Sequence, residues 1–186
     1  MSNERTGAIL HIGGTIPRRL VVALCAEISA ATVGLDWSEH GFTPGGAQKT
    51  LANCSRDLMA SLDDEQHLTV YDDEARQGVM WALEDWLKSH DIPFTRFAEA
   101  TIECGPMRTD FRPGRPVYET FTDTGRDTLI EASALNKVIA KLQERNRTPT
   151  RRIGFAIRTL RRLIGTHLPP LPPFVIGPTA ARHRVR

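Results

Sequence analysis

The charge of this chain is divided along its length, and that division sets its organisation. The last forty-two residues contain ten arginines and no acidic residue, whereas all twenty-two Asp and Glu residues lie at or before Glu144. With fourteen basic residues, residues 1–144 carry a formal charge of −8, and residues 145–186 carry +10. A split of this kind suggests an anionic partner for the basic part. The sequence therefore predicts an acidic domain at 1–144 and a cationic tail at 145–186.

Length and composition allow one folded domain with an appendage. A segment of about 145 residues, in a chain that is 40% hydrophobic, can bury a core without disulfide bonds or metals. The three cysteines, Cys25, Cys54 and Cys104, lack the short spacings of a metal site or a disulfide framework, which favours a reducing compartment. The chain has no run of eighteen apolar residues and no apolar run that follows a basic N-terminal segment. We therefore expect a cytoplasmic protein without a signal peptide or a membrane-spanning helix.

The first half of the chain alternates between strand and helix patterns. Short apolar runs predict strands at residues 8–12, 33–37 and 67–71. Each run is followed by apolar residues at helical spacing. The three helices are expected to begin at Thr15–Pro17, Thr43-Pro44 and Asp72-Asp73, where capping side chains or prolines favour a helix start.

After Pro93 the pattern changes to alternation with period two. Strand candidates lie at 94–98, 107–111, 117–122 and 127–130, and a helix carrying Leu135, Val138, Ile139 and Leu142 follows them. Alternating units followed by a meander are typical of an α+β fold. We therefore predict a mixed sheet with helices mainly on one face, in the order β-α-β-α-β-α, then an antiparallel meander and a closing helix.

The basic tail contains an amphipathic helix at about residues 151–164. Placing successive residues 100° apart gathers Ile153, Ala156, Ile157, Leu160, Leu163 and Ile164 on one arc. Arg151, Arg158, Arg161 and Arg162 lie on the opposite side, with Arg152 at its edge and Phe155 among them. Residues 169–173, Pro-Pro-Leu-Pro-Pro, are expected to form an extended polyproline strap.

The arginine side of this helix predicts an anion-binding surface. Arginine makes forked contacts to phosphate or carboxylate, and an aromatic side chain within a basic face could stack on a base. The predicted nucleic-acid-binding residues are Arg151, Arg152, Arg158, Arg161, Arg162 and Phe155. Other outcomes stay open: the helix could dock on its own acidic domain, or on a second copy to form a homodimer. It could also lie on an anionic bilayer, which is the least favoured partner, or stay a solvated tail.

A tryptophan on the polar side of the third helix marks a second surface. Trp81 projects about 160° away from the predicted core face, beside Glu84 and Asp85. A tryptophan on a polar face is costly to leave in water, so either the tail or a partner protein is expected to cover it. The predicted protein interface is therefore Trp81, Glu84 and Asp85. The acidic domain could then inhibit a host defence enzyme, such as a restriction or CRISPR effector, by mimicking nucleic acid.

Motifs that resemble catalytic sites have simpler explanations. Asp123-Thr124-Gly125 has the form of an aspartic-protease loop, but the helices upstream and the lack of a second such loop favour a hairpin turn. Asp72 and Asp73 are weak candidates for magnesium ligands, because helix capping explains both acids without a metal. The sequence therefore predicts no catalytic residue and no cofactor, and it favours a binding protein over an enzyme.

Four motifs carry a resemblance to a known group of proteins. They are Gly34-Leu35-Asp36-Trp37, Tyr71–Arg76 together with Gly78, Ile92–Phe97, and Asp110–Gly114. These segments resemble a family of small hypothetical proteins encoded on proteobacterial plasmids and integrative elements, and the resemblance covers roughly residues 8–130. It implies a mobile-element setting and no particular chemistry, and the arginine-rich tail lies outside it. The leading hypothesis is a non-enzymatic binding protein of a mobile genetic element whose C-terminal helix engages nucleic acid or a nucleoprotein complex.

Overall fold

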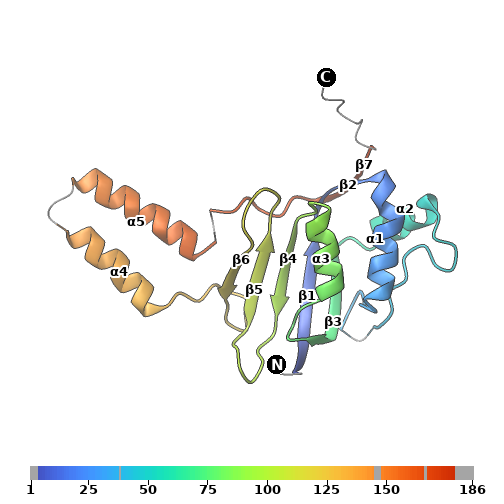
Figure 1. The fold of residues 1–186 in the computed structure, drawn as a ribbon, viewed down its shortest axis with the longest axis horizontal. Coiled ribbons are helices and arrows are strands. Elements are labelled where there is room, and N and C mark those ends of the chain that lie inside the picture. The colour runs from blue at the N-terminus through green and yellow to red at the C-terminus, as the bar shows by residue number, and fades with distance from the viewer. Residues whose placement is uncertain (1–3, 38, 145–147, 166, 179–186) are drawn as a thin grey trace.

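The protein is built around one five-stranded sheet, seen in a computed structural model that describes residues 4–37, 39–144, 148–165 and 167–178 (Figure 1). All neighbouring strands of this sheet are antiparallel. In spatial order the strands are β3 (Leu68–Arg76), β1 (Arg5–Ile12), β4 (Phe94–Ala98), β5 (Met107–Phe111) and β6 (Tyr118–Phe121). The strand that comes first in the sequence therefore lies between two strands that follow it much later.

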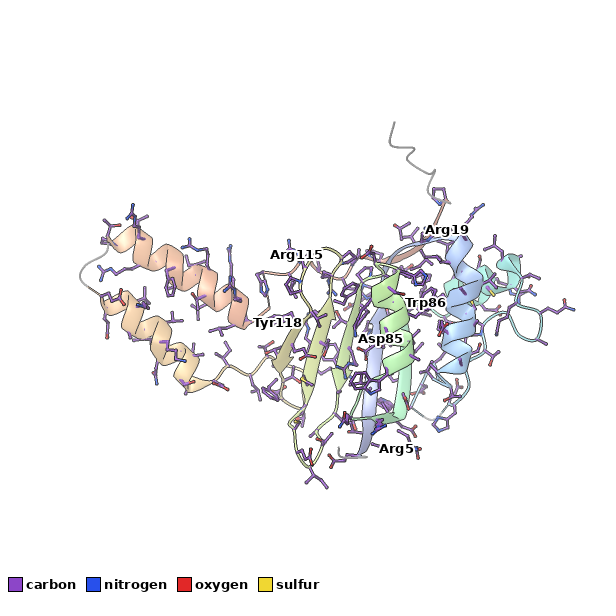
Figure 2. The ribbon with its side chains drawn as sticks, in the orientation of Figure 1. Arg5, Arg19, Asp85, Trp86, Arg115 and Tyr118 are labelled. Atoms are coloured by element: carbon purple, nitrogen blue, oxygen red, sulfur yellow. The ribbon has the colours of Figure 1, made fainter. Side chains whose placement is uncertain are left out.

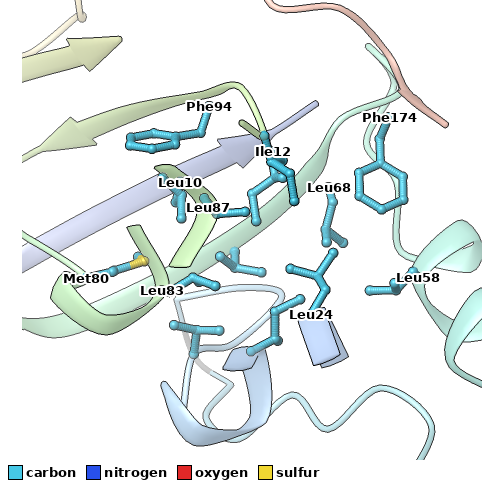
Figure 3. Close-up of a cluster of buried hydrophobic side chains, with 14 of the residues drawn as sticks. Leu10, Ile12, Leu24, Leu58, Leu68, Met80, Leu83, Leu87, Phe94 and Phe174 are labelled. Carbon is cyan, nitrogen blue, oxygen red and sulfur yellow. The ribbon is translucent and has the colours of Figure 1, made fainter. Parts of the chain in front are cut away.

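Three helices cover one face of the sheet and form the core with it (Figures 1 and 3). They are α1 (Arg18–Ala30), α2 (Leu51–Ala60) and α3 (Trp81–Ser89). Leu10 and Ile12 alternate along β1 and point into this layer, where they are fully buried with Leu24 of α1 and Leu83 of α3. Burying an aliphatic side chain of this size contributes roughly 1.5–3 kcal/mol relative to leaving it exposed. The helix face of the sheet is thus the hydrophobic core, and the opposite face carries polar side chains.

The C-terminal segment returns to this core. Strand β7 (Phe174–Gly177) pairs in parallel with β2 (Gly14–Pro17), and Phe174 is only 1% exposed within the core cluster. Gly13 allows this approach, since a Cβ atom there would lie 2.1 Å from the carbonyl oxygen of Pro172. The tail predicted at 145–186 is therefore not an appendage throughout, because its strand β7 completes the hydrophobic core.

Between the sheet and this returning strand, two helices form a hairpin that stands away from the domain (Figure 1). They are α4 (Ala132–Gln143) and α5 (Pro149–Leu163), which pack against each other and are called the arm below. The arm is fixed at its base by Tyr118 of β6, whose hydroxyl lies 2.8 Å from the carbonyl oxygens of both Arg162 and Leu163 (Figure 2). Among the described residues, no helix combines the length and the apolar composition needed to cross a membrane.

The predicted α+β class, with helices on one face and a C-terminal meander, is confirmed, and in the described part of the chain parallel pairing is confined to β2 and β7. Several elements differ from the expectation. The strand expected at 33–37 is reduced to one bridge between Gly34 and Tyr71, and that expected at 127–130 to a bridge between Thr122 and Thr128. Helix α2 begins only at Leu51, because the Thr50 side chain caps it by accepting a hydrogen bond from the backbone of residue 53.

The largest difference concerns the acids after the third strand. Strand β3 continues through Arg76, pairing with β1, so Asp72 and Asp73 lie within the strand instead of capping a helix. Ala75 in this extension is buried, and burial of an alternate position favours strand geometry over a helix start. The chain then turns at Gln77-Gly78, both with positive φ, and α3 begins at Trp81.

Candidate functional site

The arginine side of α5 is the surface that the sequence predicted most directly. The helix spans Pro149–Leu163, within two residues of the predicted bounds. Arg151, Arg158, Arg161 and Arg162 are exposed along it. Arg152 is half-buried, and its guanidinium donates a 2.8 Å hydrogen bond to the carbonyl oxygen of Leu142 in α4. Four of the five predicted arginines are thus exposed, and the fifth helps to hold the hairpin together.

A groove lies between two of these arginines. Thr150, Arg151, Gly154, Phe155 and Arg158 line an open cavity of about 540 Å³. Gly154 forms part of the groove and presents no side chain, and a Cβ atom there would lie 3.4 Å from the Arg158 guanidinium. Residues 151 and 158 are two helical turns apart and project from the same side. The groove therefore has a guanidinium at each end and room for an anion between them.

Phe155 is not a free stacking platform. It is half-buried, and it also lines a cavity of about 410 Å³ between the two helices, with Val138 and Lys141 of α4. The apolar side of α5 is only partly covered, since Ala156 is buried while Ile153 and Ile157 are 54% and 45% exposed. The arm thus carries an arginine side and a partly open apolar side.

Arg151, Arg158 and Arg162 of the arm are not neutralised by acids in the described part of the same chain. Within residues 4–37, 39–144, 148–165 and 167–178, no ion pair joins Arg151, Arg158 or Arg162 to an acid. Helix α5 packs on α4 and meets the sheet only near its C-terminal end, through Tyr118. Helix α5 therefore docks on α4, a part of residues 1–144, without placing these three arginines against an acid.

The predicted protein interface at Trp81, Glu84 and Asp85 is only partly on the surface. Trp81 is 54% exposed at the start of α3, and Asp85 is exposed and forms an ion pair with Lys88 (3.3 Å; Figure 2 labels Asp85). Glu84, however, is only 1% exposed, and its carboxylate lies 3.1 Å from the Arg96 guanidinium.

Glu84 does not lie on the surface where the interface was predicted, because it shares the buried face of α3 with Leu83 and Leu87 and pairs with Arg96 of β4. Glu84 also accepts a hydrogen bond from the backbone N–H of Met80 at 3.1 Å, which satisfies the first turn of the helix. Burial raises the pKa of Glu84, although the Arg96 charge acts in the opposite direction. Glu84 therefore has a structural role in the core.

Asp72 and Asp73 do not form a metal site with other residues that the structure describes, where no group of three potential ligands occurs. Asp72 accepts a hydrogen bond from the backbone N–H of Glu74 at 3.0 Å, and burial raises its pKa. Asp73 lies 3.6 Å from the His40 ring. Local contacts account for both carboxylates.

A second candidate site lies on the open face of the sheet, turned away from the viewer in Figure 1 behind α3. The strand register aligns Thr69, His11, Thr95, Asp110 and Tyr118 in one row across all five strands. Two adjoining cavities of about 570 and 330 Å³ lie on this face and share Phe97 and Arg126. We call these two cavities together the cleft.

One end of the cleft holds a histidine whose tautomer is fixed by its neighbours. The Thr69 hydroxyl donates to the Asp63 carboxylate at 2.6 Å, because a carboxylate can only accept. The same hydroxyl must then accept from His11 Nδ1 at 2.8 Å, which leaves His11 Nε2 as an acceptor. Burial lowers the pKa of His11, although the Asp63 charge opposes this. His11 is therefore a neutral, oriented imidazole at neutral pH.

The other side of the cleft is organised by Asp110. This buried carboxylate lies 2.8 Å from the Arg108 guanidinium and 3.2 Å from that of Arg112, and it accepts a hydrogen bond from the Thr95 hydroxyl at 2.7 Å. The guanidinium of Arg112 also donates to the carbonyl oxygen of Pro169 at 3.1 Å. This contact ties the Pro-rich strap to the sheet and closes one end of the cleft.

Arg126 completes the cleft from the hairpin turn at Asp123–Asp127. Its guanidinium lies 5.3 Å from the centre of the Phe97 ring, and that of Arg108 lies 5.7 Å from the same ring. Arg126 has a left-handed backbone conformation (φ 69°), which is uncommon for a residue other than glycine. The predicted turn at Asp123-Thr124-Gly125 is confirmed by the hydrogen bond from Arg126 N–H to the Asp123 carbonyl oxygen.

No family model, curated protein or solved structure matches this chain. The arm and the cleft are therefore interpreted from their own residues. Sequence reasoning found helix α5 because its arginines lie within one helix, but it did not predict the hairpin, since the helix at 135–142 was expected to close the domain. It missed the cleft, whose residues come from separate segments. A local signal was present, because residues two apart lie on the same face of a strand. This spacing puts Thr95 with Phe97, and Arg108 with Asp110.

Proposed function

We propose that this chain is a non-enzymatic binding protein that engages nucleic acid through the arginine side of its arm, in the setting of a mobile genetic element. The observation that carries the proposal is the groove between Arg151 and Arg158. Both guanidinium groups stand on a helix that projects from the domain, and neither is paired with an acid in the described part of the chain. The mobile-element setting rests on the sequence resemblance alone.

A phosphate is the anion that suits this groove best. A guanidinium can donate two parallel hydrogen bonds to one phosphate, and such contacts are stronger than those between neutral groups. Nucleic acids offer phosphates in a row, so the neighbouring Arg161 and Arg162 could bind further along the same backbone. If the four exposed arginines each bind a phosphate of duplex DNA, log K falls with log salt at a slope of about −3.6.

The first experiment measures binding of labelled single- and double-stranded DNA and RNA by fluorescence anisotropy. The full chain is compared with the double variant Arg151→Gln/Arg158→Gln. A truncation at residue 146 is unsuitable, because it also removes Phe174 from the core. The matched control is Arg18→Gln/Arg19→Gln, which removes the same charge from the exposed start of α1 (Figure 2 labels Arg19).

The proposal predicts that the arm variant weakens binding about tenfold or more, since each lost phosphate contact removes part of a salt-dependent attraction. The α1 variant should bind as the unmodified chain does. Equal affinities for the two variants would contradict the proposal, and so would the absence of binding to every probe near physiological salt.

A homodimer is a second candidate, and the open apolar side of the arm supports it. Ile139 of α4 is 51% exposed, and Ile153 and Ile157 of α5 are exposed to a similar degree. Contact between two such arms would bury these side chains and bring two arginine surfaces into one assembly. Light scattering after size exclusion tests this directly: a monomer at all concentrations contradicts the dimer and leaves the nucleic-acid proposal unaffected.

A further inference from the structure

The cleft on the open face of the sheet has the features of a ligand site, and none of its residues belongs to the arm. One compartment is lined mainly by apolar and aromatic side chains, with Glu99 and Asp123 among them, and the other mainly by charged ones, with Phe97 and Arg126 shared between them. A ligand that fills both compartments needs a flat apolar group at one end and a charged group at the other. The residues that line each compartment restrict the chemistry of the ligand further.

The apolar compartment is shaped for a flat ring. The Trp37 indole packs edge-to-face on Tyr71, with ring centres 5.2 Å apart, and Phe97 and Pro106 line the same cavity. Gly7 lets the Glu99 carboxylate and the Trp37 indole both lie close to β1, because a Cβ atom there would come 2.7 Å from Glu99 Oε2 and 2.9 Å from Trp37 Cη2. Aromatic side chains of this kind stack on nucleobases of any sequence. Asp123 and Thr124 are exposed and line this cavity, where their side chains could bond the edge of a base.

The charged compartment favours an anion on the side of Arg126. This guanidinium contacts the Phe97 ring and has no acidic partner within the described ranges. Asp63, Asp64 and Glu65 also line this compartment and would repel an anion placed beside them. His11 lines the same compartment, and its Nε2, the ring nitrogen left as an acceptor, could receive a hydrogen bond from a ligand hydroxyl. A flat ring, an anion and a hydroxyl donor are all parts of a nucleotide.

We propose that the cleft binds a nucleoside monophosphate unit. The base lies between Trp37 and Phe97, the phosphate contacts Arg126 and Arg108, and a ribose hydroxyl donates to His11 Nε2. The same unit can come from a free mononucleotide or from one nucleotide of a single strand. The proposal rests on the cleft alone, and its test does not depend on nucleic-acid binding by the arm.

The test titrates the full chain separately with AMP, GMP, CMP and UMP by isothermal titration calorimetry. Adenosine and the other three nucleosides, and inorganic phosphate, serve as probes that contain only one half of the ligand. We expect at least one monophosphate to bind about tenfold more tightly than its nucleoside or phosphate, because it fills both compartments. Arg126→Gln and Phe97→Leu should each weaken this binding about tenfold.

Controls separate a lost contact from a damaged fold. Arg126 is exposed on a turn, so its replacement leaves the core intact, and the urea midpoint of Arg126→Gln should match that of the unmodified chain. Arg19→Gln, on the helix side of the sheet, should bind the nucleotide normally. The arm variant Arg151→Gln/Arg158→Gln should also keep its mononucleotide affinity, which separates failure of this proposal from failure of the arm.

A tetranucleotide distinguishes the two sources of the ligand. If it binds at least tenfold more tightly than the mononucleotide and loses this gain in Arg126→Gln, the cleft takes a nucleotide of a strand. If both bind equally, the cleft takes the free nucleotide. The proposal is overturned if no monophosphate binds at millimolar concentration, if a nucleoside or phosphate alone binds as tightly, or if Arg126→Gln and Phe97→Leu leave the affinity unchanged.

Discussion

The ion pair between Glu84 and Arg96 gives the sharpest prediction about the fold. Their side chains are 2% and 3% exposed, and the carboxylate lies 3.1 Å from the guanidinium. Replacing Glu84 by Ala leaves the Arg96 charge buried without a counter-charge, which costs roughly 3–5 kcal/mol of folding free energy. The backbone N–H of Met80 loses its acceptor as well, and an unsatisfied buried donor costs about 1–3 kcal/mol, part of which overlaps with the first figure.

A loss of this size is easy to measure in a chain of 186 residues. Domains of this length lose about 2–4 °C in Tm per kcal/mol, so Glu84→Ala should lower the Tm by roughly 6–20 °C. Urea unfolding followed by circular dichroism measures the free energy itself. Asp85→Ala removes the neighbouring exposed carboxylate and should change stability by about 0.5 kcal/mol or less.

The double variant Glu84→Leu/Arg96→Met completes the test. Replacing both charges by apolar groups of similar volume is often neutral for stability. The double variant should therefore be much more stable than a variant that has lost only one of the two charges. The reasoning would be refuted if Glu84→Ala stayed within about 1 kcal/mol of the unmodified chain, because Glu84 would then be a solvated surface residue.

Three further predictions follow from other contacts. Phe174→Ala should cost about 3–5 kcal/mol in urea unfolding, whereas Val175→Ala, at an exposed neighbour, should cost under about 1 kcal/mol; equal costs would mean that β7 does not complete the core. Burial lowers the pKa of His11 despite Asp63, so the unfolded chain binds the proton first as pH falls below 6.5. Stability should therefore decrease with acidification below pH 6.5, and less steeply in His11→Gln; parallel pH profiles would contradict this. Tyr118→Phe removes the hydroxyl that fixes the base of the arm and should speed amide hydrogen exchange at the end of α5, which unchanged rates would exclude.

Local patterns in the sequence were enough to predict the meander and helix α5, although not the pairing of α5 with α4. The strands at 94–98 and 107–111 match β4 and β5, because period-two alternation bounded by turn residues has one simple interpretation. Helix α5 was predicted because its apolar and arginine sides are separated within a single segment. Each of these elements is specified by residues close together in the chain.

Elements that depend on distant partners were not predictable in the same way. Asp72 and Asp73 precede apolar residues at helical spacing and therefore indicated a helix cap, yet pairing with β1 keeps them in a strand. Glu84 is placed inward by Arg96 of β4, a residue twelve positions later in the sequence. Phe174 packs into the core because β7 pairs with β2, and these two strands lie near opposite ends of the chain.

The cleft was missed for the same physical reason. His11, Thr95 and Asp110 become neighbours only through the register of β1, β4 and β5, and that register is set by packing of the helix face. A shift of one residue in any strand would turn these side chains into the core. Histidines scattered through the sequence therefore gave no indication that one of them is held by a threonine and an aspartate from elsewhere.

The salt dependence of nucleic-acid binding tests the central proposal most directly. Binding of a labelled duplex is measured between low and physiological salt for the unmodified chain, for Arg151→Gln/Arg158→Gln and for Arg18→Gln/Arg19→Gln. Each phosphate contact contributes about 0.9 to the slope of log K against log salt, so the arm variant should have a slope shallower by about 1.8. The α1 variant should keep the original slope. Identical slopes for all three proteins would show that the arm does not hold the phosphates, and the proposed function would be wrong.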